Sequence, residues 1–377
     1  MSRHALNIEH YTSPATLELE RQNLFGKLWT FVGFASMVAE KNRFFTRNVA
    51  GVPVLVQRTD AGIRAFVNQC PHRLSAIQLD SHGKRPMVCP YHAWSFGPEG
   101  ELHGLPNPGL YQFTAAEREH ICLKKLHLHE LGTLLFVNLS DTPLPLEEQF
   151  SPEMLRELEQ VSAHLDSQVI YSCHRAHYNW KLNMENVKDY NHVPFVHPRS
   201  FSPEMATPIR ALAGEPDTPS QVKPMIRGET PLPSLASLSY ATRAALKPHQ
   251  SWFRPLCDLY RDEHVYYNWF LYPNVNFCSV RGEHFLLQQY DPVAPGITDY
   301  HLWMMTARRK DARTDFVPLL SALIRAERSV IAEDTVILER LQENMGSHSP
   351  RFTHGEYEMP LVHQHMWYRS QVLGDAA

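Results

Sequence analysis

Apolar residues follow helical spacing at the start of the chain and strand-like spacing soon afterwards. In residues 15–30 the apolar positions Leu17, Leu24, Phe25 and Leu28 recur at near-helical intervals. Residues 45–67 then alternate between apolar and polar positions, as half-buried strands do. The run HELGTLLFVNLSD at 129–141 predicts one buried strand. A helix followed by a β-rich module is therefore expected in the first part of the chain.

The second part of the chain repeats both kinds of pattern on a larger scale. Residues 174–192 predict a strand and then a helix, and 264–306 predict successive antiparallel strands separated by proline and glycine. A long helix is predicted over 312–345, with an apolar stripe at Phe316, Leu320, Leu323, Ile331, Leu338 and Leu341. Strands and helices in separate runs are typical of the α+β class.

The length of 377 residues exceeds what one core usually organises, so two main domains are expected. The proline-rich DTPLPLEE marks the junction between them. Residues 201–262 are rich in proline, serine and alanine with weak periodicity, which indicates a lid or insertion. The predicted division is an N-terminal helical segment (1–35) that packs on the last domain, a β-rich domain (36–150) and a last, larger domain (160–377).

The charge and composition of the chain argue against several classes of function. The net charge of −4 provides no basic excess, so neither nucleic acid nor an anionic membrane surface is an expected partner. No apolar run approaches the roughly 20 residues of a membrane span, and MSRHALNIEH lacks the apolar core of a signal peptide. A cytoplasmic protein is expected. Four cysteines without framework spacing are expected to be buried and reduced: Cys122, Cys173, Cys257 and Cys278.

Two short loops carry the strongest chemical pattern. Cys70-Pro-His72 is followed after sixteen residues by Cys89-Pro-Tyr-His92. Each loop brings one sulfur and one nitrogen ligand, whereas structural zinc sites usually draw pairs of like ligands. Mixed pairs suit a [2Fe–2S] cluster in which one iron takes both cysteines and the other takes both histidines. Structural zinc stays as the alternative. Trp94 is placed to shield such a cluster from water.

A second group of ligand-type residues lies in ENVKDYNHVPFVHP. On a continuous helix Glu185, Asp189 and His192 share one face, whereas His197 points away from it. Because proline disfavours helix in the preceding residue, Pro194 and Pro198 are expected to break the helix and let the two histidines converge on one ion. A pair of histidines in a chain with 22 of them is otherwise more often structural.

The third ligand is expected on the final helix. Asp334 falls near the middle of the apolar stripe, where an unpaired carboxylate is costly and a metal ion or an equally strong partner is implied. Glu327 lies on the same stripe, whereas Glu333 and Glu339 point away from it and are expected to be solvated. Two histidines and a carboxylate form the facial triad of non-heme Fe(II) sites. Asn186 is either a neighbour that tunes this site or an amide on the helix surface.

These strings resemble the bacterial Rieske non-heme iron oxygenases over most of the chain. CPHR and CPYHAWSFG are similar to the Rieske loops; Ser75 and Tyr91 stand where the respiratory Rieske proteins carry two further cysteines. NWK-x3-EN-x2-D-x2-H-x4-H and ED-x4-E-x2-Q are similar to the strings around the mononuclear iron. The resemblance implies an all-β Rieske domain followed by a helix-grip (START/Bet v 1-like) domain with an antiparallel sheet.

The resemblance also implies a mechanism and partners. NAD(P)H is oxidised by a separate flavin reductase, with or without a ferredoxin, and the electrons enter a cluster held by Cys70, His72, Cys89 and His92. In the family, the residue matching Asp189 connects a cluster histidine (His92) of one subunit to an iron histidine (His192) of its neighbour in a homotrimer. His192, His197 and Asp334 would then hold the iron where O2 and an organic substrate react.

The substrate is the least determined property. MENVKD is similar to ring-hydroxylating enzymes that act on aromatic acids, which favours an aromatic substrate, whereas the length and the ending resemble monooxygenases and demethylases, some of which act on quaternary amines. Candidate pocket residues are Tyr178, Trp252, Phe270, Tyr272 and Trp303, and candidate carboxylate partners are Lys181, Arg210, Arg227 and Arg243. A Rieske electron carrier without oxygenase activity and a zinc-stabilised binding module are the alternatives of other classes.

Overall fold

The computed structural model describes residues 6–205, 231–261, 263–346, 352–355 and 358–374. It divides into two compact units, Phe25–Leu144 and Met1–Leu24 together with Pro145–Ala377. The first junction falls eleven residues earlier than the predicted end of the N-terminal segment at residue 35, because Thr30–Phe34 already pairs as a strand inside the smaller unit. Residues 206–230 and 262 of the predicted lid (201–262) lie outside the described residues, and Arg210 and Arg227 are among them.

The smaller unit is built almost entirely from antiparallel strands. Its seven-stranded sheet has the order β1-β9-β8-β4-β3-β2-β5, and β6 pairs with β7. The bounds are β1 (Thr30–Phe34), β2 (Arg43–Val49), β3 (Val52–Thr59), β4 (Gly62–Val67), β5 (His82–Lys84), β6 (Ser95–Phe96), β7 (Leu102–Gly104), α3 (Ala115–His120), β8 (Lys125–Leu131) and β9 (Leu134–Asn138).

Alternation along β3 places the two cores of this unit. Val54 and Val56 belong to one cluster of buried, mostly aliphatic residues. Leu55, on the opposite face of the strand, packs in a second cluster that contains Cys70 and Cys89. One apolar face of the sheet therefore packs against the two cysteine loops and shields them from water.

Two predicted elements of the first part differ from the structure. The single strand expected over 129–141 is wrong: Gly132, at φ +58°, reverses the chain there, so the segment is the end of β8 followed by β9. The helix expected over 15–30 ends at Phe25, after α2 (Pro14–Glu20) and a short π-helical stretch. The strand β1 follows within five residues.

The larger unit combines one antiparallel sheet with helices. The sheet order is β10-β16-β15-β14-β13-β11, with β12 paired to β16. The bounds are α1 (Glu9–Thr12), α4 (Leu146–Gln149), α5 (Pro152–Ser162), β10 (Leu165–Ala176), α6 (Trp180–Asn186), α7 (Val193–Val196), β11 (Tyr240–Ala245), β12 (Cys257–Asp258), β13 (Val265–Leu271), β14 (Val275–Val280), β15 (His284–Ala294), β16 (Ile297–Arg309), α8 (Val317–Asn344) and α9 (Met359–Tyr368).

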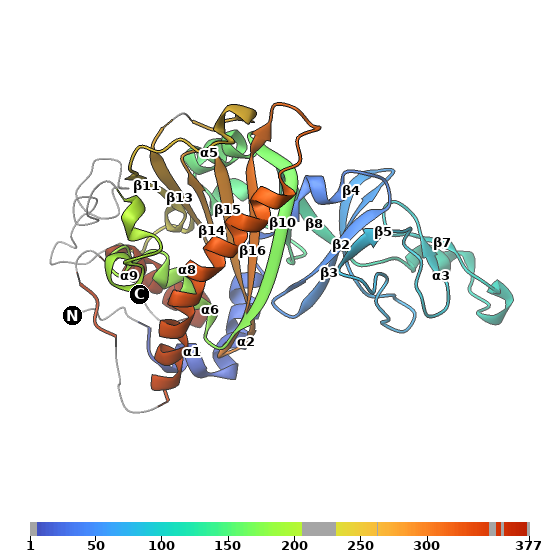
Figure 1. Cartoon of the computed structure of the whole chain (residues 1–377). Helices are drawn as coiled ribbons and strands as arrows, with labels where there is room; N and C mark the ends of the chain where they lie inside the picture. Colours follow the sequence, from blue (N-terminus) through green and yellow to red (C-terminus); the bar gives the residue numbers. More distant parts are fainter. Residues whose placement is uncertain (1–5, 206–230, 262, 347–351, 356–357, 375–377) are drawn as a thin grey trace. The chain divides into compact units, whose positions relative to one another are not determined.

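The long helix α8 crosses one face of this sheet and packs on β10 and β16 (Figure 1). Its buried residues Leu320, Ile331 and Leu338 belong to the predicted stripe. Leu341 was also predicted on this stripe, but it is 42% exposed and does not belong to the buried face of the helix. The predicted α+β class, with a β-rich first domain and an antiparallel sheet gripped by a helix, is confirmed.

The N-terminal helices are fixed to the larger unit by a buried carboxylate. Glu20, 1% exposed, accepts hydrogen bonds from Trp180 Nε1 at 2.8 Å and Lys181 Nζ at 2.5 Å, and also from the hydroxyl of Tyr368. A buried ion pair of this kind is stable only when its remaining donors and acceptors are satisfied, as they are here. The pair fixes the start of α6.

The four cysteines without framework spacing form no disulfide in the described residues, and of the four only Cys257 and Cys278 are buried. Cys122 and Cys173 are exposed, so burial was wrongly predicted for this pair. Cys173 lies on β10, whose middle residues alternate between half-buried and exposed positions.

Candidate functional site

The two cysteine loops of the smaller unit share one backbone design. The amide of Leu74 donates to the carbonyl of Cys70, and the amide of Ala93 donates in the same way to Cys89. Each loop then turns through a residue with positive φ, +60° at Leu74 and +55° at Ala93. Residues other than glycine rarely adopt this conformation, so the surrounding structure holds both turns in place.

The four predicted ligands of this unit lie together. Cys70 and Cys89 are 1% and 2% exposed, and their side chains are within hydrogen-bonding contact of each other. The rings of His72 and His92 are half-buried, with centroids 4.6 Å apart. Trp94 stacks on His72 at 4.5 Å with an interplanar angle of 7°, so its indole covers one face of that ring. The sulfurs are thus shielded and the imidazoles face outward.

The chemistry of this group fits a metal cluster. Burial is the main cause that raises the pKa of the Cys70 thiol to about 11, and the hydrogen bond with Cys89 adds to it. Two desolvated thiols become thiolates when a metal ion compensates their charge. The buried Nδ1 of His72 also has no hydrogen-bond partner in the described residues.

The second group begins with helix α6, whose start is set by Asn179. Its side-chain oxygen accepts the amide hydrogen bond of Lys181 at 3.1 Å, so it is the N-cap. The amide nitrogen of the same side chain donates to the carbonyls of Tyr11 and Pro295. The NWK string therefore fixes α6 in position.

Helix α6 ends earlier than expected. It stops at Asn186, so Glu185 and His192 do not share a helix face as predicted; Glu185 instead accepts hydrogen bonds from Tyr11 and His365. Pro194 does not break a helix but lies in the first turn of α7, where the missing amide hydrogen has no cost. The irregular turn before α7 lets the chain bend, and His192 and His197 flank this short helix at its N-cap and C-cap positions.

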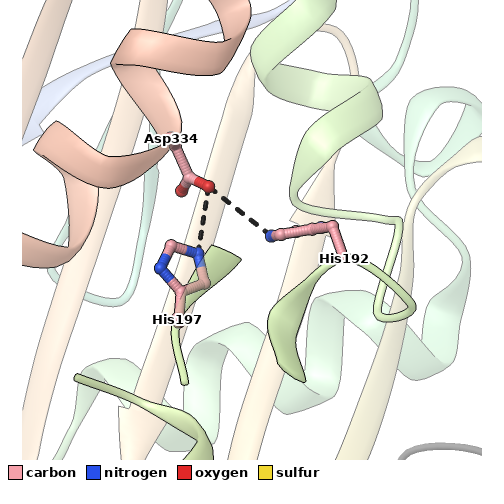
Figure 2. A group of neighbouring side chains, drawn as sticks. All are labelled: His192, His197 and Asp334. Carbon is pink, nitrogen blue, oxygen red and sulfur yellow. Dashed lines mark ion pairs between the residues drawn. The ribbon is translucent and has the colours of Figure 1, made fainter. Parts of the chain in front are cut away.

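The structure brings His192, His197 and Asp334 together (Figure 2). Asp334 Oδ1 lies 3.6 Å from His192 Nε2 and 3.0 Å from His197 Nε2. One potential ligand atom from each residue lies within 4.8 Å of the other two. Asp334 Oδ1 is buried without a hydrogen bond of good geometry, so a cation between these three atoms fits the donor set.

The two imidazoles have different electrostatic surroundings. Burial lowers the pKa of His192, and Asp334 and Asp189 only partly oppose this. Burial also acts to lower the pKa of His197, but its contacts with the carboxylates of Asp334 and Glu333 prevail and the pKa is raised.

Glu333 is a part of this site that the sequence interpretation assigned to the solvated face. Its Oε2 lies 2.7 Å from Nδ1 of His197 and accepts a hydrogen bond from Ser200 at 2.6 Å. Its carboxylate pKa is lowered by these two bonds. A carboxylate on the second nitrogen of a ligand histidine fixes the orientation of the ring and raises its basicity. The sequence signal that could have identified Glu333 is its position directly before Asp334 in AEDTVILERLQ.

Asp189 and Asn186 lie beside the three side chains. Asp189 Oδ2 is 3.9 Å from Nδ1 of His192, and Oδ1 accepts the amide hydrogen bond of Asn191. Asn186 lies in the wall of the adjacent cavity, and no hydrogen bond in the described residues joins it to His192, His197 or Asp334.

A cavity of about 630 Å³ lies against the three side chains. Its wall comes from the segment between α6 and α7, from the sheet and from α8. The five aromatic candidates of the sequence analysis do not line the described wall. Trp303, for example, is on the sheet face opposite to Tyr300 and Met304. The aromatic residues that do line it are Tyr190, Phe201, Phe253, Tyr266 and Tyr300.

The described carboxylate-partner candidates are also outside this wall. Lys181 is 1% exposed and paired with Glu20, and Arg243 is exposed on β11 over the ring of Tyr267. None of the described helices combines the length and apolar character needed to cross a lipid bilayer.

Two family descriptions match the chain. Residues 28–114 match the Rieske [2Fe–2S] domain, and residues 153–374 match the catalytic domain of the ring-hydroxylating alpha subunits. A choline monooxygenase of Amaranthus tricolor is 26% identical over 373 residues, which cover 95% of this chain and 75% of that protein. The anthranilate 1,2-dioxygenase large subunit of Burkholderia cepacia is 32% identical over 198 residues, 50% of this chain and 46% of that subunit.

Solved structures show the same fold at lower identity. A quaternary ammonium Rieske monooxygenase, CntA, superposes with a TM-score of 0.75 at 20% identity and covers 97% of this chain and 95% of that one. A naphthalene 1,2-dioxygenase from Rhodococcus sp. gives 0.68 at 17% identity with the same coverage. The choline monooxygenase of Beta vulgaris aligns over 43% of its own length, so the chain spans less than half of that relative.

The predicted family is confirmed by these matches. The Rieske match assigns a [2Fe–2S] cluster to the smaller unit, and the catalytic-domain match assigns a mononuclear iron to the larger one. Relatives of both kinds, monooxygenases and dioxygenases, are oxidoreductases. The chain belongs to the family of ring-hydroxylating oxygenase alpha subunits that join a Rieske domain to an iron-dependent catalytic domain.

Proposed function

We propose that this protein is the terminal oxygenase of a multicomponent Rieske system. It accepts electrons that a separate reductase takes from NAD(P)H, directly or through a ferredoxin, and uses O2 to hydroxylate an organic substrate. The observation that carries this proposal is the convergence of His192, His197 and Asp334 at the wall of a cavity of about 630 Å³. A volume of this size accommodates a small organic molecule beside the three side chains.

Seven side chains hold the redox groups in this proposal. Cys70, Cys89, His72 and His92 hold the cluster, and the facial set His192, His197 and Asp334 holds iron. When bound by two histidines and one carboxylate, Fe(II) keeps coordination positions open for O2.

The remaining residues position and insulate these groups. Trp94 covers His72, and Glu333 holds the His197 ring through Nδ1. The two cluster imidazoles are half-buried, whereas the two cysteines are buried. Electrons therefore leave the cluster through the imidazoles. Asp189, beside Nδ1 of His192, is the bridge to His92 of a neighbouring subunit in a homotrimer, and Asn186 tunes the site from the cavity wall.

The sequence favours an aromatic substrate, and the apolar and aromatic side chains of the cavity wall support one. Hydroxylation of a quaternary amine or a methylated nitrogen or oxygen is the second candidate. It is supported by relatives named choline monooxygenase and carnitine monooxygenase, and by the carboxylate of Glu327 in the cavity wall. The four cysteines outside the cluster loops form no disulfide in the described residues, which supports a cytoplasmic location.

Labelled oxygen tests the proposal. Iron-loaded protein is supplied with NADH, a flavin reductase and a panel of aromatic acids, arenes and quaternary amines under ¹⁸O2. The expected result is label in the product of at least one compound, with one labelled atom for monooxygenation and two for dioxygenation. Reduction of the cluster without label in any product, in a panel that covers both substrate classes, would favour the electron carrier.

A further inference from the structure

Glu327 is the feature of the cavity that the reaction described above does not use. It lies on α8 seven residues before Asp334, on the same face of the helix and about 10 Å away along its axis. Both side chains line the same cavity. A ligand held at Glu327 therefore extends inside the cavity toward the three converging side chains.

The carboxylate of Glu327 has no ion pair and no hydrogen bond within the described residues. The other carboxylates of the described cavity wall have partners. Asp189 and Asp334 lie beside histidines, and Glu204 accepts a hydrogen bond from Arg281 at 2.8 Å. Glu327 is thus the cavity carboxylate whose charge the protein leaves uncompensated.

The surroundings of Glu327 make an unpartnered, charged carboxylate unfavourable at this position. Burial raises the pKa of the Glu327 carboxyl to about 7, Asp334 adds to the shift, and His197 opposes it. Burying a carboxylate without a partner costs several kcal/mol or causes it to take up a proton. A cation in the cavity removes that cost.

Aromatic rings accompany the carboxylate. Tyr266 on β13 and Tyr300 on β16 are close enough for Glu327 to raise their pKa values, after the larger effect of burial. Both rings line the cavity. A carboxylate with neighbouring aromatic rings is a typical environment for an ammonium group, which gains from both the charge and the ring faces.

The lysine and arginine side chains of the described wall offer an acidic substrate no free partner. Arg281, the one arginine or lysine there, is 4% exposed and already paired with Glu204. Burial lowers the pKa of His284 to about 4, so this histidine is neutral at physiological pH. Charge therefore discriminates against carboxylate ligands within the described wall.

We propose that Glu327 is the specificity-determining residue of the cavity and selects substrates that carry a positively charged nitrogen. The inference rests on the proposed function, because it names the substrate class of the same site. The aromatic ring expected from the sequence is compatible with it when the ring bears an amine.

Two matched series of small molecules test the proposal by binding alone. Choline is compared with its neutral carbon isostere 3,3-dimethyl-1-butanol, and benzylamine with benzyl alcohol and benzoate. Affinities for oxidised, iron-loaded protein are measured by calorimetry without reductase. We expect each cation to bind wild-type protein at least about tenfold more tightly than its neutral partner, about 1.4 kcal/mol. Benzoate should bind most weakly.

The variants separate a charge effect from a folding effect. In Glu327→Gln the preference for cations should fall to about twofold or less, with iron content and cluster absorbance unchanged. Glu343→Gln removes the same charge from an exposed position on α8 and should retain the wild-type preference.

Equal preference in wild-type protein and Glu327→Gln, tighter binding of benzoate than of benzylamine, or no saturable binding of either cation would overturn the inference. Because these measurements need no turnover, they stand apart from the oxygen-labelling test. Labelled product from neutral substrates alone would overturn the role of Glu327 and leave the oxygenase function intact.

Discussion

Glu333 and His197 form a carboxylate–imidazole pair, with Oε2 2.7 Å from Nδ1, while the next residue, Asp334, lies 3.0 Å from Nε2 of the same ring. Two consecutive acidic residues of α8 thus contact both ring nitrogens of one histidine. The pair assigns the proton of the neutral imidazole to Nδ1, which leaves Nε2 free to face a metal ion beside Asp334.

Glu333→Gln should weaken binding of the mononuclear iron by about 10–100-fold, because the ring loses its charged orienting partner. Iron affinity is measured by titration of the iron-depleted protein, with cluster absorbance as the internal reference. Glu343→Gln, on the exposed face of the same helix, should bind iron like wild type. Unchanged affinity in Glu333→Gln would show that Ser200 and the backbone suffice to hold His197 in position.

Cys89→Ser should abolish the visible absorbance of the cluster, since the second loop then lacks its sulfur ligand. Iron at His192, His197 and Asp334 should be retained, because the larger unit contains all three side chains. Absorbance spectra and iron analysis of the same sample check both expectations. Retained cluster absorbance in Cys89→Ser would exclude this cysteine as a ligand.

Asn179→Ala should destabilise the protein by roughly 2–4 kcal/mol. The variant loses the cap of α6, about 1 kcal/mol, and leaves the carbonyls of Tyr11 and Pro295 without their donor. Asn179→Asp keeps a cap oxygen but not the donor, so its loss should be intermediate. Urea unfolding measures both variants; equal stability of wild type and Asn179→Ala would refute the anchoring role.

The buried ammonium group of Lys188 should make the free energy of unfolding depend on pH. Burial lowers the pKa of this ammonium to about 7, with Glu185 opposing the shift, and Nζ donates to Gln364 at 2.7 Å. Between about pH 7 and the ordinary lysine pKa of about 10.4, the unfolded chain binds more protons than the folded one. Stability from this group therefore rises with pH across that window, by about 2–3 kcal/mol from pH 7 to 9.

Replacement by methionine, which has a similar shape and no charge, should remove this slope. Urea unfolding of wild-type protein and Lys188→Met at pH 7, 8 and 9 makes the comparison. The same slope in both proteins would mean that other groups produce it.

Local sequence strings predicted most of the site because their chemistry depends on short spacings. The two cysteine loops and the His192–His197 pair each lie within a few residues, and the stripe of α8 identified Asp334. The course of the backbone between these ligand-type residues was less predictable. The end of α6 at Asn186 depends on tertiary contacts of Glu185 with Tyr11 and His365, which no local pattern encodes.

Long-range contacts also explain the errors. Glu333 points off the apolar stripe, and only the position of His197, 136 residues away in the chain, makes it part of the site. Lys181 was predicted to meet a substrate carboxylate, but its partner Glu20 comes from the N-terminal helix. Strand alternation identified the aromatic residues of β16 without showing which sheet face has the cavity, so Trp303 was chosen instead of Tyr300.

Iron content tests the central claim most directly. We expect about three iron atoms per chain in the purified, iron-loaded protein, two in the Rieske cluster and one at the His192–His197–Asp334 site. Asp334→Ala should contain about two and keep the paramagnetic resonance of the reduced cluster. About two irons in both proteins, or zinc in place of iron, would contradict the existence of a separate iron centre at these three residues.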